Sequence, residues 1–223
     1  MVGIMSNENW IGELPVRVRD AIMQRVKVLD VPAGVVVKQT GDAPSAMYQV
    51  QQGFLRLQGL HPDGNQVLIL IYRSGNSFSE STLVARRQAN HTTVALTDAR
   101  ISRLSSDDFW DLYHHHPEIP EALCRKFANN ISRQFVAREI RRAHRLRKLI
   151  ALMFENLADH CGQSSPGGAV SIPIPLTQTD IAAHYDVTRQ SVQREVGMLK
   201  ANGVLSKLNG IWQIADLEAL RRI

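Results

Sequence analysis

The stretch from Thr188 to Ala201 carries the residue types with the most specific chemistry in this 223-residue chain. Projection at 100° per residue places Val192, Val196 and Leu199 on one face of a helix. The opposite face carries two guanidinium groups and two carboxamides, those of Arg189, Gln190, Gln193 and Arg194. Guanidinium groups pair bidentately with guanine, and carboxamides with adenine, in the major groove of DNA. The pattern predicts a helix that contacts base edges; the alternative is an ordinary polar face of a surface helix.

Capping signals frame this helix and a shorter one before it. Thr177, with Asp180 three residues later, is an acidic variant of the capping box and predicts a helix over residues 178–185. After a two-residue turn, Thr188 caps the second helix, which Asn202-Gly203 ends. A helix-turn-helix places the first turns of its second helix in the major groove. The cap hydroxyls and the positive helix N-terminus suit phosphate contacts.

A hairpin is expected after the second helix. Asn209-Gly210 lies between two short alternating apolar runs, and this pair is the strongest short-range hairpin signal. Helix, turn, helix and hairpin in this order make a winged helix, with Lys207 in the wing. The expected DNA-contacting residues are Thr177, Thr188, Arg189, Gln190, Ser191, Gln193, Arg194 and Lys207, together with Arg145 and Arg147 nearer the N-terminus.

Residues 28–104 have the pattern of a β domain. Short β-branched and apolar runs are separated by turn signals at a spacing of roughly 8–12 residues, which is typical of a sandwich or barrel. The expected strands are 35–37, 47–50, 54–57, 67–72, 92–96 and 101–104. Pro62-Asp63-Gly64-Asn65 predicts a hairpin turn, because glycine takes a positive φ at no steric cost. Before this domain, residues 14–26 predict a short amphipathic helix.

A long helical stretch is expected from Pro117 to about His160, because the only prolines lie at its start and it contains no glycine. One apolar stripe along it consists of Leu123, Phe127, Ile131 and Phe135, and a second of Ala122, Asn129, Val136 and Ala143 with Ile140 beside them. A helix with two such faces can pack on its own domain with one face and on a second copy with the other. Burial of the helix within one chain is the alternative. A further apolar stretch from Leu149 begins the next domain.

Positive charge is concentrated near the end of the long helix. Nine lysines and arginines and one acid, Glu139, lie between Arg125 and Lys148, although the whole chain has a formal net charge of only +5. This segment makes the chain basic, with a pI of about 9.5. The segment favours a polyanionic partner, with a solvated helix face as the alternative.

The composition excludes several classes of protein. No apolar run approaches the roughly 18 residues of a membrane span, and the N-terminus has no basic region followed by an apolar one. The two cysteines, Cys124 and Cys161, cannot build a disulfide framework. We therefore expect a cytoplasmic protein with free thiols.

These motifs, in this order, resemble the Crp/Fnr family of bacterial transcription regulators over nearly the whole chain. Residues 41–57, followed by Gly75, Phe78 and Glu80, resemble the family's β-roll, and residues 188–199 match its recognition helix. The resemblance implies an α+β fold: an N-terminal cyclic-nucleotide-binding-like β-roll (jelly roll), a long dimerisation helix and a C-terminal winged helix-turn-helix. The expected domains are 1–116, 117–145 and 146–223. The resemblance also implies a homodimer that binds a palindromic site on double-stranded DNA, with RNA polymerase as a partner.

The effector region departs from the family members that bind cyclic AMP. Those members have a Gly-Glu pair and, ten residues after the Glu, an Arg-Ser pair that holds the phosphate; two hydroxyl residues on the long helix complete the pocket. The corresponding residues here are Ser79, Glu80, Asn90, His91, Thr92, Gln134 and Phe135. Asn90 replaces the arginine, which removes a charge-assisted contact worth about 1.5–3 kcal/mol or more. We expect no productive binding of cyclic AMP.

No cofactor is expected. Two cysteines are too few for the four thiolates of an iron–sulfur cluster. His91 leaves haem open as an alternative, and Cys124 leaves a redox switch open. Adjacent histidines at positions 114–116 do not converge on one helix face, so no metal site is predicted there. A regulator controlled by its own abundance is a further alternative.

Two departures bear on DNA recognition. Gln190 stands where the family has a Glu that accepts from cytosine N4, and a carboxamide suits adenine. The half-site should therefore differ from TGTGA or TTGAT at the position that Gln190 contacts. Arg145 stands where cyclic AMP receptors carry an Asp, and with Arg147 it is expected to add salt-dependent affinity for the DNA backbone.

Two other functions compete with DNA-binding regulation. A β-roll that senses haem, redox state or another ligand and acts mainly through protein contacts would not need the wing or the Arg189–Arg194 face. A metal-dependent jelly-roll enzyme needs a His-x-His pair with a Glu on neighbouring strands, whereas the β region has only His61 and His91, both isolated. Catalysis is therefore not expected.

Overall fold

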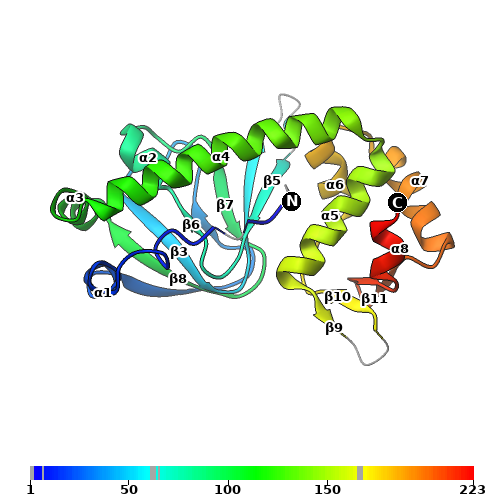
Figure 1. Cartoon of the computed structure of the whole chain (residues 1–223), viewed down its shortest axis with the longest axis horizontal. Coiled ribbons are helices and arrows are strands. Elements are labelled where there is room, and N and C mark those ends of the chain that lie inside the picture. The colour runs from blue at the N-terminus through cyan, green and yellow to red at the C-terminus, as the bar shows by residue number, and fades with distance from the viewer. Residues whose placement is uncertain (1–2, 7, 61–63, 65, 165–167) are drawn as a thin grey trace. The chain divides into compact units, whose positions relative to one another are not determined.

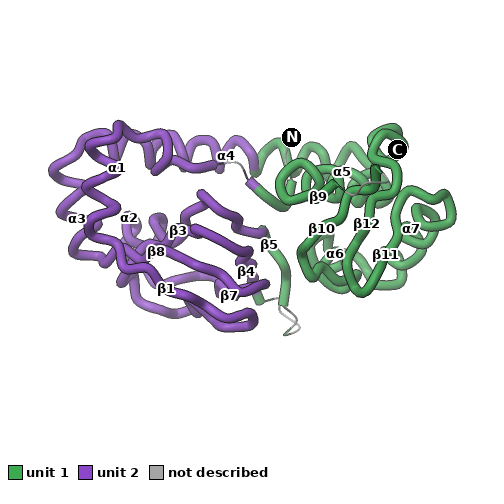
Figure 2. The backbone as a smooth tube through the Cα atoms, turned by 90° about the horizontal axis from the view of Figure 1, so that it is seen from below, with its two compact units in different colours: residues 1–5, 60–70, 134–223 green, residues 6–59, 71–133 purple. Residues whose placement is uncertain are grey.

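The computed structural model describes residues 3–6, 8–60, 64, 66–164 and 168–223. Figure 1 shows a strand-rich N-terminal part, the long helix α4 (Glu118–Ala143) and a mixed C-terminal part. Two compact units make up the chain: residues 6–59 and 71–133 in one, and residues 1–5, 60–70 and 134–223 in the other (Figure 2). The division falls within α4, and the domain boundaries expected at residues 116 and 145 stay a prediction.

Two four-stranded sheets form the β-roll. Their strands are β1 (Lys27–Val31), β2 (Val36–Lys38), β3 (Ala46–Gln52), β4 (Leu55–Leu60), β5 (Gln66–Tyr72), β6 (Ser77–Phe78), β7 (Thr92–Ala95) and β8 (Ala99–Ser105). The strand order is β1-β8-β3-β6 in one sheet and β2-β7-β4-β5 in the other. The expected β domain is confirmed, but the sequence did not predict β1 or β6. The sequence of β1 does not alternate between apolar and polar residues, and only Val31 is buried. The strand is therefore defined by its pairing with β8 and not by a local pattern.

Stacked aromatic rings and a tight turn at a glycine hold the strands of the β-roll together. Phe78 stacks on Tyr48 and on Tyr72, with ring centroids 5.1 and 5.0 Å apart. Between β3 and β4, Gly53 has φ +83, and a Cβ there would lie 2.4 Å from the carbonyl oxygen of Asp98, so only glycine fits. The hairpin turn expected over residues 62–65 lies outside the described residues except for Gly64, whose φ is 86°.

A second core joins the β-roll to its helices. The expected N-terminal helix is confirmed as α1 (Val16–Met23), and α3 (Ser106–His115) follows β8. Buried side chains from α1, α3 and the first turns of α4 form this core, among them Val18, Ile22, Phe109, Leu112, Ile119, Ala122 and Leu123. A short helix that the sequence did not predict, α2 (Glu80–Ala85), begins directly after β6.

The apolar stripe on α4 changes its surroundings along the helix. Leu123 is buried in the core of the roll, and Phe127 packs partly against it. One and two turns further on, Ile131 and Phe135 are 60% and 59% exposed. The first half of α4 therefore belongs to the β-roll core, whereas its second half presents bare apolar side chains.

The C-terminal part is a winged helix, as expected. Its elements are α5 (Leu146–Cys161), β9 (Gln163–Ser164), β10 (Val170–Ile172), α6 (Gln178–Tyr185), α7 (Arg189–Ala201), β11 (Leu205–Leu208), β12 (Ile211–Ile214) and α8 (Leu217–Arg221). The sheet order is β11-β12-β10-β9. Trp212 anchors the core: its ring lies 5.1 Å from that of Phe154, and its Nε1 donates to the Leu176 carbonyl at 2.7 Å.

Within the described parts of the chain, no helix has both the length and the apolar composition needed to cross a bilayer.

Candidate nucleic-acid interface and effector region

The polar face of α7 is exposed as the sequence predicts. The Oγ1 of Thr188 accepts from the Ser191 backbone N–H at 3.1 Å and so caps the helix. Val192, Val196 and Leu199 are at most 1% exposed, which fixes the rotation of the helix. The side chains on the opposite face, Arg189, Gln190, Gln193 and Arg194, are all exposed. The arrangement brings two guanidinium groups and two carboxamides together within the first turns of one helix.

Helix α6 is held in place by its cap and by contacts at its C-terminal end. The Thr177 Oγ1 accepts from the Asp180 N–H at 3.0 Å, and Asp180 Oδ2 accepts from the Thr177 N–H at 2.9 Å, which completes the capping box. At the other end, the Tyr185 hydroxyl donates to the Leu149 carbonyl of α5 at 2.7 Å. Asp186, with φ 56, then makes the turn toward α7. The hydroxyls of Thr177 and Thr188 therefore already serve as caps.

His184, on α6, is kept neutral by its surroundings. Burial lowers the pKa of His184 to about 4, and the nearby positive charge of Arg141 acts in the same direction. Its Nδ1 lies 3.0 Å from the Leu68 carbonyl, to which the neutral ring donates. The helix thus carries a desolvated, uncharged imidazole on its inner side.

The wing is a two-residue hairpin. Asn209 and Gly210, with φ 49 and 82, connect β11 to β12 in the left-handed conformation that this pair favours. Lys207 is exposed on β11, with its Nζ 5.0 Å from the Trp212 ring centroid. The predicted wing cation is therefore available at the surface.

The two arginines expected at the DNA backbone differ in their surroundings. Arg145 is the exposed N-cap residue of α5. Arg147, in the first turn, donates through Nε to the Glu195 carboxylate of α7 at 2.9 Å. The charge of Arg147 is thus balanced by an acid on α7. The charge of Arg145 is not balanced by any acid that the structure records among the described residues.

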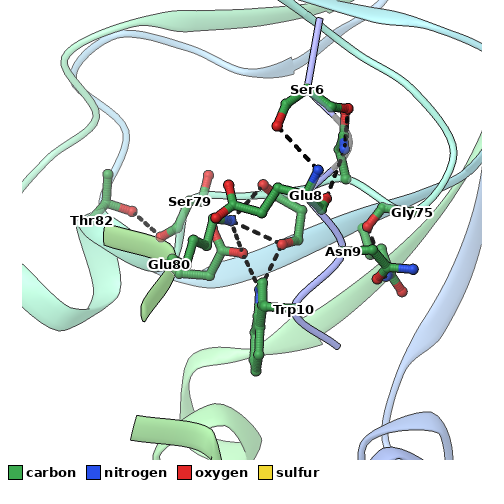
Figure 3. Close-up of polar contacts among 12 residues, drawn as sticks. Ser6, Glu8, Asn9, Trp10, Gly75, Ser79, Glu80 and Thr82 are labelled. Carbon is green, nitrogen blue, oxygen red and sulfur yellow. Dashed lines mark hydrogen bonds and ion pairs between the residues drawn. The ribbon is translucent and has the colours of Figure 1, made fainter. Parts of the chain in front are cut away.

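In the β-roll, Glu80 is buried in a network that the sequence did not predict (Figure 3). Glu80 is 2% exposed and Lys126, from α4, 7% exposed. The Lys126 ammonium donates to Glu80 Oε1 at 2.8 Å and to the carbonyl and hydroxyl of Ser77 at 3.0 Å each. Burial raises the pKa of Glu80, but the charge of Lys126 and the hydrogen bonds from Lys126, Ser77 and Trp10 together outweigh it, so the pKa lies below its usual value. The result is a charged, buried ion pair between α2 and α4.

The N-terminal segment completes this network. Trp10 is 3% exposed, and its indole N–H is shared between the Ser77 hydroxyl at 2.7 Å and Glu80 Oε1 at 3.0 Å. The Asn76 side chain holds the segment by donating to the Ser6 and Glu8 carbonyls at 3.2 and 2.8 Å. Figure 3 shows the indole of Trp10, which belongs to the N-terminal segment, next to the Glu80 carboxylate. The carboxylate therefore has an indole and an ammonium as its partners.

The other predicted effector residues do not join this network. Ser79 has φ 75, a left-handed conformation that explains why a glycine stands there in other family members. Asn90 and His91 are exposed, and Thr92 bonds with Thr40. On α4, Gln134 and Phe135 are exposed. A hollow of about 380 Å³ elsewhere on the roll is lined by residues 30–32, 52 and 98–100, which include none of the predicted effector residues.

The residues of these sites that were not predicted from the sequence include Trp10, Ser77, Lys126 and Glu195. Lys126 was counted as one cation of the basic segment, and its interval from Glu80 has no periodicity that would connect them. The available signal was its place beside Leu123 and Phe127, on the buried side of the helix. Glu195 could have been noticed as the one acid among the polar residues of α7.

Comparison with known protein families gives separate matches for the β-roll and for the winged helix. A family model for the cyclic nucleotide-binding domain matches residues 28–116, and a model for the Crp-like helix-turn-helix domain matches residues 141–223. The CRP-like cAMP-activated global transcriptional regulator of Mycobacterium tuberculosis is 24% identical over 213 residues, which are 91% of this chain and 90% of that protein. Transcriptional regulator SdrP of Thermus thermophilus is 23% identical over 176 residues, 79% of this chain and 82% of that protein.

Solved structures share the fold. The crystal structure of a CRP/FNR-family transcriptional regulator from Thermus thermophilus has a TM-score of 0.72 at 24% identity, covering 88% of this chain and 97% of that one. A cyclic-nucleotide-binding-type β-roll followed by a long helix and a winged helix defines a class of DNA-binding transcription regulators. The chain belongs to the Crp/Fnr family of that class.

Proposed function

We propose that this regulator acts in the cytoplasm as a homodimer that binds a palindromic promoter site through α7, without cyclic AMP. The observation that carries the DNA-binding part is the exposed face of Arg189, Gln190, Gln193 and Arg194 opposite a buried apolar seam. These side chains carry donors and acceptors that match guanine and adenine edges. Arg145 and Lys207, both exposed, are proposed phosphate contacts that add affinity without specificity.

Dimerisation is supported by the second half of α4. Ile131 and Phe135, 60% and 59% exposed and four residues apart, form an apolar face, with Val136 38% exposed beside them. A second copy that packs the same face against this one would bury it on both chains, in an isologous interface. Two recognition helices related by a two-fold axis suit half-sites about one DNA turn apart. RNA polymerase is a further proposed partner, as in the family.

Independence from cyclic AMP is supported by the network around Glu80. Glu80 is 2% exposed, and its Oε1 already accepts from Lys126 and Trp10, so a nucleotide hydroxyl would compete with these two donors for a buried carboxylate. At the position expected to hold the phosphate, Asn90 supplies no charge. The relative in Mycobacterium tuberculosis is described as cAMP-activated; for the present chain, we propose a β-roll whose polar site is filled by its own side chains.

Genome-wide footprinting with the full-length purified protein tests the DNA-binding proposal. We expect protected palindromes, with equal protection whether or not cyclic AMP is added, and loss of protection with Arg189→Ala and Arg194→Ala combined. Absence of any protected sequence, or protection unchanged by the double substitution, would refute α7 as the reading helix. Calorimetry with cyclic AMP tests the other part, and binding at micromolar concentration would contradict it.

A further inference from the structure

Glu195 lies between two arginines at the surface expected to meet DNA. Its Oε2 accepts from Arg147 Nε at 2.9 Å, and its Oε1 accepts from Arg194 Nε at 3.1 Å. The Glu195 side chain is 12% exposed, whereas those of Arg147 and Arg194 are 37% and 71% exposed. Each carboxylate oxygen thus serves one guanidinium, and the acid is the least accessible member of the group.

The acid stays charged in this setting. Burial raises the pKa of Glu195, but the hydrogen bonds from Arg147 and Arg194 outweigh it, so that the pKa lies below its usual value. One negative charge is therefore shared by two cations at neutral pH. Arg147 is further fixed by donating through Nη2 to the Met198 sulfur.

The contacts of Glu195 with Arg147 and Arg194 connect α5 to α7. Arg147 belongs to the first turn of α5, and Glu195 and Arg194 to α7. A guanidinium that remains paired with a carboxylate releases fewer counterions from DNA, so it contributes less to sequence-independent attraction. Adjacent residues on a helix do not face each other, so the Arg194 side chain must bend along the helix surface to reach Glu195 Oε1 at 3.1 Å.

We propose that Glu195 is a positioning residue for DNA recognition, which retains Arg147 on the protein and orients Arg194 for base contact. This inference rests on the proposed DNA-binding function. In physical terms, the carboxylate lowers affinity for any duplex while it preserves discrimination by α7. Direct contact of Glu195 with cytosine is the competing role, but both oxygens are occupied and the side chain is mostly buried.

The test compares Glu195→Gln with the wild-type full-length chain on the footprinted palindrome and on a random duplex of equal length, at several salt concentrations. Loss of one acid frees about one cation per protomer. The slope of log affinity against log salt should steepen by about 0.9 per protomer, or about 1.8 per dimer. Random duplex should bind several-fold more tightly, and the ratio of specific to random affinity should fall.

Three matched variants separate this role from others. Glu195→Asp keeps the charge and should stay near the wild-type slope. Glu195→Gln with Arg147→Ala should return to it, because the freed cation is gone. Glu13→Gln, the same charge change at an exposed position ahead of α1, should leave the salt slope and the specificity ratio unchanged.

The outcomes distinguish the two proposals. Failure of the wild-type protein to bind any duplex would refute the proposed function. Normal binding with an unchanged salt slope in Glu195→Gln would refute the role of Glu195. A changed preference at one base pair without a change in slope would also refute it, in favour of direct base contact. Thermal melting of each variant checks that the winged helix stays folded.

Discussion

Gln190 is exposed at the start of α7, on the face that carries Arg189 and Arg194. A carboxamide donates and accepts, whereas a carboxylate only accepts. We predict that Gln190→Glu shifts the preference at one position of each half-site from adenine toward cytosine. The discrimination should change by about 1–3 kcal/mol. Selection of binding sites from a random duplex library measures it.

The prediction has a matched control. Gln24→Glu makes the same chemical change at an exposed position outside the winged helix and should leave the selected sequence unaltered. Uniform weakening of all sequences by Gln190→Glu, with no change in base preference, would show that Gln190 does not contact a base.

Lys126 should be essential to the stability of the β-roll. Its removal leaves the buried Glu80 carboxylate without its ammonium partner, and such a change costs about 3–5 kcal/mol. We predict that Lys126→Met destabilises the chain by this amount, and that adding Glu80→Gln restores part of it. Urea denaturation measures both, with Lys27→Met, an exposed lysine on β1, as the control of small effect.

The same pair predicts an inversion of pH dependence. In the wild type the pKa of Glu80 lies below its unfolded value, so its contribution is present above that value and declines as the pH falls through the folded one. In Lys126→Met, burial is opposed only by the hydrogen bonds from Ser77 and Trp10, so the pKa of Glu80 should rise and the folded state should bind the proton more tightly. The deficit of the variant should shrink between pH 7 and pH 5; a constant deficit would contradict the ion pair.

At the residue scale, the sequence predicted the exposed side chains of α7 but not the partners of Glu80. Periodicity within one helix determines which side chains share a face, and this signal needs no knowledge of the rest of the fold. Glu80 and Lys126 meet only because β6, α2 and α4 pack together, and Trp10 joins them from another segment. Pairing between distant residues has no local signature.

At the scale of single elements, the capping box of α6 should support the whole helix-turn-helix. We predict that Thr177→Ala destabilises the winged helix by about 1 kcal/mol, because the Asp180 N–H loses its acceptor. Thr179→Ala, at an exposed position inside the same helix, is the control and should change stability little. Thermal melting followed by circular dichroism measures both, and equal effects of the two substitutions would contradict the cap.

The elements that the sequence predicted best are those whose ends carry capping or turn residues. Helices α6 and α7 begin directly after Thr177 and Thr188, and Asp186 and Asn202 are their C-cap residues, as capping rules require. The wing turn at Asn209 and Gly210 also follows its local signal. Strands β1 and β6 lack such signals, because pairing with β8 and β3 defines them.

At the scale of the whole molecule, the bare face of α4 should determine the oligomeric state. We predict that Phe135→Asp weakens the dimer by about 100-fold or more, because the charge would be placed in both halves of a symmetric apolar interface. DNA affinity should fall with it, since one protomer reads only one half-site. Analytical ultracentrifugation measures the change. Asn130→Asp, on a different side of the same helix, is the control, and a Phe135→Asp chain that remains dimeric would exclude this face.

The proposed independence of the β-roll from cyclic AMP has an evolutionary consequence. Trp10, Asn90 and Lys126 lie in three separate stretches of sequence. Trp10 and Lys126 occupy Glu80 Oε1, and Asn90 supplies no charge where the proposal expects a phosphate. Replacing any one of them would leave the other obstacles in place, and replacing Lys126 alone would also cost folding stability. On the proposal made above, a descendant of this chain would acquire nucleotide control only through several coordinated changes, so the loss of that control should be hard to reverse.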